Sequence, residues 1–135
     1  NKKNKNEISI KEILNKKQNI VLKIDIEGDE YKILKAVKRN YHKINLLIIE
    51  FHNISKNMIK IKKFLSNSKL KIIHLHANNY GGVDKFDNPN VIEVSLINSK
   101  KFLVNRKKST EHYPIPGLDF KNLKRREDIR LRFDD

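Results

Sequence analysis

The chain has 135 residues, of which 38% are hydrophobic and none is cysteine, so it forms one domain at most and has no disulfide, thiolate zinc site or cysteine nucleophile. No apolar run approaches the roughly 20 residues that span a bilayer, which leaves a cytoplasmic protein without a membrane span as the expectation. The net charge of +14 does not favour a nucleic-acid partner, because most of the 30 basic residues are Lys spread along the whole chain and no stretch interleaves Arg with aromatic residues.

The first predicted elements are a short helix and a buried strand. Residues 1–7 are polar and are expected to fray. Ser9 and Glu12 have the spacing of a capping box, which predicts that a short helix begins there. Residues 20–26 (IVLKIDI) are rich in β-branched side chains, which predicts a buried strand that Gly28 closes.

The rest of the chain continues this alternation. A helical stripe ends near Asn40, and a second strand is expected over 46–51 (LLIIEF). Ser55 is the expected cap of the next helix. A third strand is expected over 70–75 and a fourth over 91–97. The alternation of strands and helices is typical of an α/β fold with a parallel sheet, and the near-continuous apolar runs favour a sheet covered on both faces.

Polar residues follow the carboxyl ends of the first three predicted strands, which is where open α/β sheets bind their ligands. In chain order these residues are Asp25, Glu27, Glu50, His52, His76, Asn78 and Asn79. If the three strands are parallel neighbours, their ends share one rim, and the side chains converge there. Carboxylates and imidazoles grouped in this way can deprotonate a hydroxyl or hold a divalent metal.

Simpler roles stay open for some of these side chains. Asp25 is also suited to capping the helix that follows the first strand. His74 lies deeper in the third strand and is expected to be a satisfied core histidine. Glu50 and His52 are two residues apart and therefore share one face of their strand. We favour a functional role for this pair, because burying a lone Glu at a strand end is costly.

The sequence contains no Gly-rich turn of the GxGxxG or P-loop kind. Its one pair of glycines, Gly81 and Gly82, follows the third predicted strand instead of opening a helix. The chain therefore shows no evident cradle for a nucleotide-like cofactor.

Several segments resemble one known family. Residues 22–30 (LKIDIEGDE) resemble the Asp-Ile/Val-Glu-Gly-x-Glu signature of FkbM-type methyltransferases. Residues 47–52 (LIIEFH) look like the next strand of that family, and residues 88–94 resemble its last, antiparallel strand. Residues 113–120 are similar to the C-terminal segment of some members. The resemblance spans about residues 9–133.

The resemblance implies a class I methyltransferase fold, a Rossmann-like, doubly wound sheet of parallel strands with a last antiparallel strand. It also implies S-adenosylmethionine as the methyl donor and a hydroxyl of a small molecule or glycan as the acceptor. Asp25 would then lie near the methyl group and belong to both the cofactor and the catalytic sites. The family's early strands have no counterpart, so we expect residues 1–135 to be a single domain, the C-terminal half of the family's domain, and inactive alone.

Within this interpretation the base is His52 or His76, because imidazole titrates near neutral pH. Asp25 and Glu50 would orient the base or the acceptor. The expected acceptor contacts are Glu27, Asn78 and Asn79. A divalent metal held by Asp25, Glu50 and His76 is an alternative, although the prediction itself includes no metal. Two other hypotheses stay open: a catalytically inactive methyltransferase-like module for binding or assembly, and a basic domain that binds polyanions.

Overall fold

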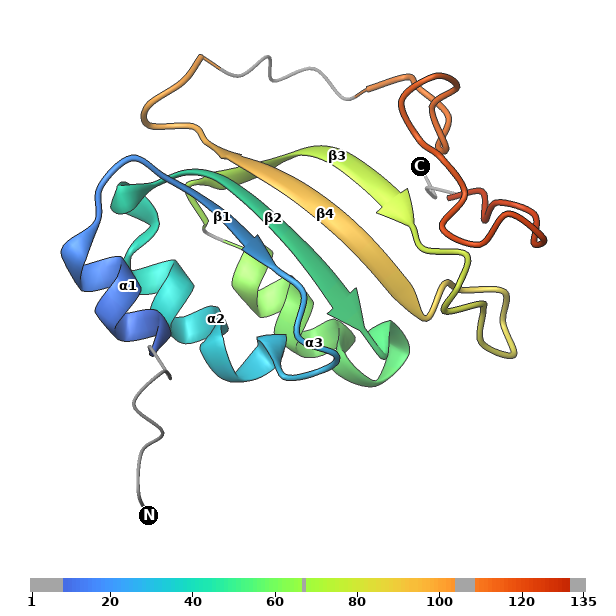
Figure 1. Ribbon diagram of the computed structural model, residues 1–135, viewed down its shortest axis with the longest axis horizontal. Coiled ribbons are helices and arrows are strands. Elements are labelled where there is room, and N and C mark those ends of the chain that lie inside the picture. The colour runs from blue at the N-terminus through green and yellow to red at the C-terminus, as the bar shows by residue number, and fades with distance from the viewer. Residues whose placement is uncertain (1–8, 67, 104–108, 132–135) are drawn as a thin grey trace.

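A computed structural model describes residues 9–66, 68–103 and 109–131 (Figure 1). The predicted fraying of residues 1–7 lies outside these ranges. The elements are α1 (Ile10–Lys16), β1 (Ile20–Ile24), α2 (Glu30–Arg39), a 3-10 turn η1 (Tyr41–Lys43), β2 (Ile44–His52), α3 (Ile54–Leu65), β3 (Leu70–Ala77) and β4 (Val91–Asn98). All four predicted strands are present, and the α/β class is confirmed.

The four strands form one mixed sheet in the order β1-β2-β4-β3. β1 and β2 are parallel, and β4 is antiparallel to both β2 and β3. The antiparallel direction predicted for β4 is therefore confirmed. The predicted three-stranded parallel core is wrong in one respect: β4 lies between β2 and β3, so these two strands run in the same direction without being neighbours. The arrangement is consistent with part of a methyltransferase fold.

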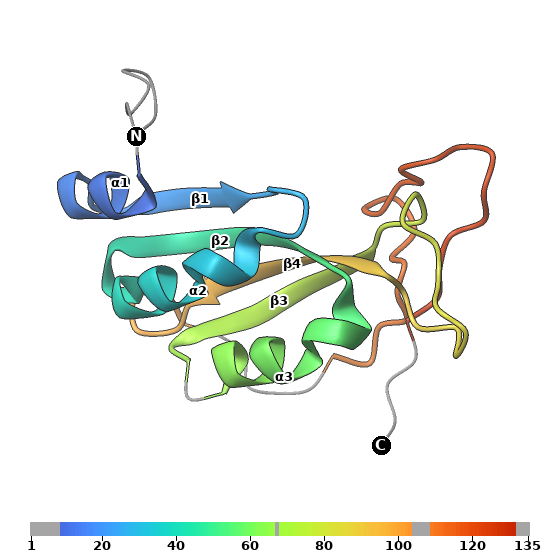
Figure 2. The same cartoon turned by 90° about the horizontal axis from the view of Figure 1, so that it is seen from below.

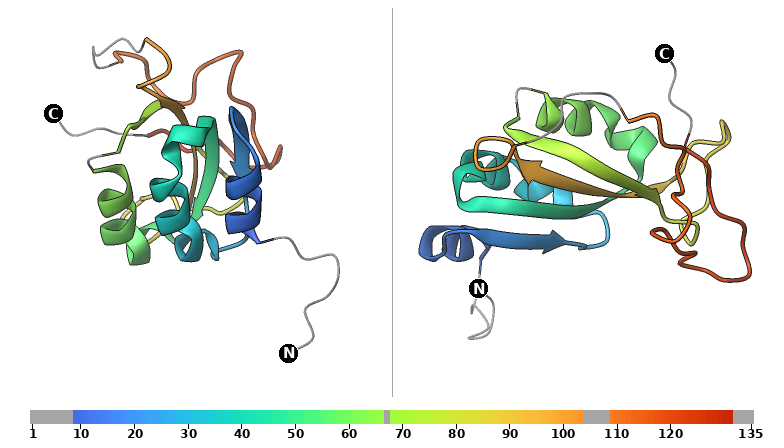
Figure 3. Two further views of the ribbon diagram at one scale, coloured as in Figure 1. Left: turned by 90° about the vertical axis from the view of Figure 1, so that its left-hand side faces the viewer. Right: turned by 90° about the horizontal axis from the view of Figure 1, so that it is seen from above.

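The three helices pack on one face of the sheet (Figures 1 and 3). Leu14 of α1, Val37 of α2 and Phe64 of α3 belong to one buried cluster with strand residues such as Leu47 and Leu96. No helix in the described ranges is long and apolar enough to cross a bilayer. The described residues thus form a helix layer and a sheet layer, and helices on both faces, as a doubly wound sheet requires, are not seen among them.

The opposite side of the sheet, which no described helix covers, is called the open face below. Val21 of β1 points there and is 66% exposed, so the expectation of strands covered on both faces is wrong for β1 within the described residues. Side chains alternate along a strand, and the register therefore places Lys23, Glu50 and Glu93 on this open face. Residues 109–131, called the C-terminal segment, lie beside the loop that follows β3 (Figure 2).

Local sequence features explain where two of the helices begin. The capping box of Ser9 and Glu12 is present at α1, as predicted. The cap predicted at Ser55 is wrong, because α3 begins after Asn53, which has φ 51°. Asn tolerates this left-handed conformation, which turns the chain from β2 into the helix. The hydroxyl of Ser55 instead donates a hydrogen bond to Asp84.

Candidate active site

The structure divides the predicted site residues into two groups. The first, called the His52 cluster, lies where β1 and β2 end and consists of Asp25, Glu27, Glu30 and His52. The second surrounds a cavity on the open face, called the open-face cavity, and includes Glu50, His76 and Asn78. Both groups lie toward the carboxyl ends of the parallel strands, as expected. Of the four residues predicted to form one cluster, Asp25 and His52 belong to the first group, and Glu50 and His76 belong to the second.

A tight turn after β1 shapes the His52 cluster. Glu27 has φ 54° and Gly28 has φ 99°, two consecutive residues with positive φ. A residue with a side chain rarely adopts such a φ, and glycine does so without strain. The turn places the Glu27 carboxylate Oε2 3.4 Å from Nε2 of His52.

The imidazole of His52 lies between two carboxylates. Its Nε2 faces exposed Glu27, and its Nδ1 is 3.4 Å from Oε1 of Glu30. The His52 side chain is 12% exposed, whereas Glu30 is fully buried. The buried Glu30 carboxylate thus lies beside Nδ1, which makes no hydrogen bond with the described residues, and Nε2 is the ring nitrogen placed for proton transfer.

Glu30 also holds the backbone around His52. Its two carboxylate oxygens accept hydrogen bonds from the Gly28 N–H (2.9 Å) and the His52 N–H (2.7 Å). The neighbouring Tyr31 hydroxyl donates to the His52 carbonyl, and burial raises the pKa of this hydroxyl above its usual range. Sequence reasoning missed Glu30 as a site residue, although it is the last residue of the LKIDIEGDE block.

Asp25 belongs to the His52 cluster and does not cap a helix. The N-cap of α2 is Asp29, which makes no capping hydrogen bond through its side chain, so the capping alternative for Asp25 is wrong. Asp25, Glu27 and His52 each offer a ligand atom within 4.8 Å of the others. Two carboxylates and one imidazole have the chemistry of a divalent-cation site. In the described part of the chain, the predicted metal set that combines Asp25 with Glu50 and His76 does not form such a group.

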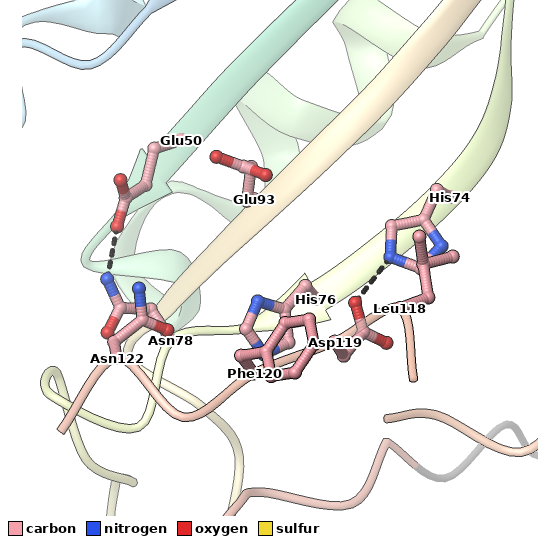
Figure 4. Close-up of a pocket in the computed structure, with 9 residues that line it drawn as sticks. All are labelled: Glu50, His74, His76, Asn78, Glu93, Leu118, Asp119, Phe120 and Asn122. Carbon is pink, nitrogen blue, oxygen red and sulfur yellow. Dashed lines mark hydrogen bonds and ion pairs between the residues drawn. The ribbon is translucent and has the colours of Figure 1, made fainter. Parts of the chain in front are cut away.

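The open-face cavity has a volume of about 330 Å³. Its strand side presents Glu50 of β2 directly opposite Glu93 of β4, and Glu93 in turn lies opposite His76 of β3 (Figure 4). Oε1 of Glu50 accepts a hydrogen bond of 2.6 Å from the Asn78 side chain. Nζ of Lys23 lies 2.9 Å from Oε2 of Glu93, and this hydrogen bond raises the pKa of the Lys23 ammonium.

The C-terminal segment supplies the other wall of the cavity. Nε2 of His74 lies 2.7 Å from Oδ1 of Asp119 (Figure 4), and Oδ2 of Asp119 accepts a hydrogen bond from the Ile115 N–H. His74 is therefore satisfied, as predicted, but it lies in the wall of the cavity and not in the core. Asn79 is 1% exposed, and its amide exchanges hydrogen bonds with the N–H and the carbonyl of Leu123. The acceptor contact predicted for Asn79 is corrected to an anchoring role, because its amide is occupied by the segment.

The family model of the methyltransferase FkbM domain matches residues 1–87, whereas no curated protein and no solved structure matches the chain significantly. The matched range contains β1, β2, β3 and every residue of the His52 cluster. β4 and the C-terminal segment lie beyond it, so the resemblance seen over 88–94 and 113–120 stays a prediction. The match covers well over half of the sequence and includes the signature at 22–30. The chain belongs to the methyltransferase FkbM domain family.

Proposed function

We propose that this chain contributes the proton-transfer and acceptor side of an S-adenosylmethionine-dependent O-methyltransferase. The observation that carries this proposal is the position of His52, whose two ring nitrogens face Glu27 and buried Glu30 where two parallel strands end. Methyl transfer to a hydroxyl needs a positioned base. The acceptor class that we propose is a hydroxyl of a small molecule or glycan, and the compartment that the cysteine-free sequence favours is the cytoplasm.

S-adenosylmethionine supplies the activated methyl group when it is bound. The His52 cluster fits such a cationic donor, because the Asp25 carboxylate is exposed and forms no ion pair with Lys or Arg in the described part of the chain. The sequence lacks a Gly-rich turn, so we propose that residues outside 1–135 complete the cofactor site. On this proposal residues 1–135 are the C-terminal half of the family's domain and are inactive alone.

In the proposed reaction Nε2 of His52 would take the proton of the acceptor hydroxyl as its oxygen receives the methyl group, whose bond to the donor sulfur breaks to leave S-adenosylhomocysteine. Glu30, beside Nδ1, stabilises the imidazolium that forms and keeps the ring in place. Glu27 positions the acceptor hydroxyl against Nε2. Glu50 and Asn78 in the open-face cavity hold the remainder of the acceptor.

His76 is the second candidate for the base. Its Nε2 is buried and makes no hydrogen bond with the described residues, and it lines the open-face cavity with Glu50. A ring without a carboxylate to orient it is a weaker base, which is why we favour His52. A catalytically inactive module that binds or assembles remains the alternative to either assignment.

Substitutions at these histidines test the proposal in a protein that joins residues 1–135 to the residues that complete the cofactor site, called the full chain below. His52→Gln should lower turnover by about 10²–10⁴-fold, the usual contribution of a general base, and leave cofactor affinity unchanged. His42→Gln is the matched control, because His42 is exposed and remote from both groups. Turnover is measured by transfer of labelled methyl, and affinity by calorimetry.

Two outcomes would contradict the assignment. A loss of turnover with His76→Gln but not with His52→Gln would move the base to the open-face cavity. A full chain that binds no S-adenosylmethionine and transfers no methyl group would favour the inactive module.

A further inference from the structure

The open-face cavity is acidic, although the chain as a whole carries a net charge of +14. Its lining includes three carboxylates, those of Glu50, Glu93 and Asp119, and contains no Lys or Arg among the described residues. Such a concentration of negative charge opposes the overall field of the protein. The local negative charge of the lining, and not the net positive charge of the chain, therefore decides which ligand charge the cavity favours.

Two of these three carboxylates are matched by partners in the protein. Asp119 is paired with His74 at 2.7 Å and also receives a backbone N–H. Glu93 is paired with Lys23, whose ammonium reaches it from β1 at 2.9 Å. Asp25 and Glu50 also raise the pKa of the Lys23 ammonium through their charges. Their effect is weaker than that of Glu93.

Glu50 is the carboxylate without a cation of its own. It is 9% exposed, and its hydrogen bond in the described structure comes from the neutral Asn78 amide. No Lys, Arg or His nitrogen of the described residues lies within ion-pair distance of it. A buried carboxylate is costly without a compensating positive charge. Its position opposite Glu93, in the lining of a cavity, allows that charge to come from a ligand.

We infer that the open-face cavity takes an acceptor that carries a primary ammonium group, placed between Glu50 and Glu93. This inference rests on the proposed function and names the class of its acceptor as an amine-bearing polyol. Glu93 already binds one ammonium, that of Lys23, through a 2.9 Å hydrogen bond, so carboxylates on this face accept such a group. An acceptor ammonium makes the same kind of charge-assisted hydrogen bond to Glu50.

The remaining walls fit the rest of such a molecule. The buried Nε2 of His76 has no hydrogen-bond partner in the described residues, so a ligand hydroxyl can satisfy it. Phe120 lines the cavity and is 74% exposed, which leaves an aromatic ring free to cover an apolar ring face (Figure 4). Phe120 belongs to the C-terminal segment, beyond the matched range 1–87. The segment therefore adds to the acceptor contacts made by the family domain.

The test compares sugars that differ in one group. Glucosamine carries the ammonium, glucose is the neutral analogue and gluconate is an anion of similar size. The full chain is titrated with each sugar, and binding is measured by calorimetry or saturation-transfer NMR. Glucosamine should bind at least about tenfold tighter than glucose, and gluconate should bind most weakly. Glu50→Gln should remove the preference for glucosamine over glucose.

Matched variants separate charge from folding. Glu93→Gln should reduce the preference as well, and Glu127→Gln is the control, because its side chain is 95% exposed and pairs with Lys121 outside the cavity lining. Circular dichroism confirms that each variant is folded. Equal affinity for glucosamine and glucose, no detectable glucosamine binding, or an unchanged preference in folded Glu50→Gln would overturn the inference. Mn²⁺ binding that Glu50→Gln abolishes, with no sugar preference, would overturn it in favour of a metal ion. These assays involve no methyl transfer, so their failure leaves the role of His52 untested, and failure of the His52 variants leaves the sugar preference intact.

Discussion

Replacing Glu30 with Ala should destabilise the protein strongly, although Glu30 lies in a sequence position that resembles an ordinary first helical turn. The side chain is fully buried and accepts two backbone hydrogen bonds, from Gly28 and His52. A donor that loses its acceptor in a buried place costs about 1–3 kcal/mol. Because both hydrogen bonds are only partly buried, we expect a total loss of about 2–4 kcal/mol in the free energy of unfolding.

Thermal and urea unfolding followed by circular dichroism measure this loss. At roughly 3–4 °C per kcal/mol for a chain of this length, Tm should fall by about 6–16 °C. Glu30→Gln keeps one carbonyl oxygen for one of the two N–H groups and should lose about half as much. Glu127→Ala, at an exposed side chain, should change stability by less than about 0.5 kcal/mol. A Glu30→Ala variant as stable as this control would refute the reasoning that Glu30 holds the site together.

Three further expectations follow from single contacts. Asn79→Ala should detach the C-terminal segment and speed its cleavage in limited proteolysis, because the Asn79 amide anchors Leu123; cleavage of Asn79→Ala no faster than that of wild type and of the exposed control Asn15→Ala would contradict this. The Ser55 hydroxyl lowers the pKa of the Asp84 carboxyl below 3.8, so this carboxyl stabilises the fold above that pH and the effect is lost as pH falls through its folded pKa. An NMR titration of Ser55→Ala should show that pKa moving up, and an unchanged pKa would contradict the hydrogen bond as its cause. Prolonged treatment with a chelator should leave methyl transfer intact, whereas a loss that Mn²⁺ restores would make the Asp25, Glu27 and His52 group a metal site.

The strands were predictable from the sequence, and their pairing was not. The apolar runs that form β1 and β2 are local signals, and so is the capping box at Ser9. The insertion of β4 between β2 and β3 depends on hydrogen bonds between residues far apart in the chain, such as Glu50 and Glu93. Periodicity carries no information on such pairing. Glu93 was missed for this reason, since it lies in the middle of a strand instead of at a carboxyl end.

The sequence predicted which residues belong to the candidate site better than it predicted which of them lie together. Asp25, Glu27 and His52 were expected near strand ends, and they are grouped there. Strand alternation predicted that Glu50 and His52 work together, but the nearest carboxylates to His52 are Glu27 and buried Glu30, and Glu50 is bonded to Asn78. The partnership of His74 and Asp119 spans 45 positions, and no local pattern indicates it.

The most direct test of the proposed chemistry is a crystal structure of the full chain with S-adenosylhomocysteine and an acceptor identified by labelled methyl transfer. We predict that the acceptor oxygen lies about 2.6–3.2 Å from Nε2 of His52, within hydrogen-bond reach, with Nδ1 still facing Glu30. An acceptor oxygen beyond hydrogen-bond reach of His52, or bound against Nε2 of His76 instead, would contradict the assignment of His52 as the base.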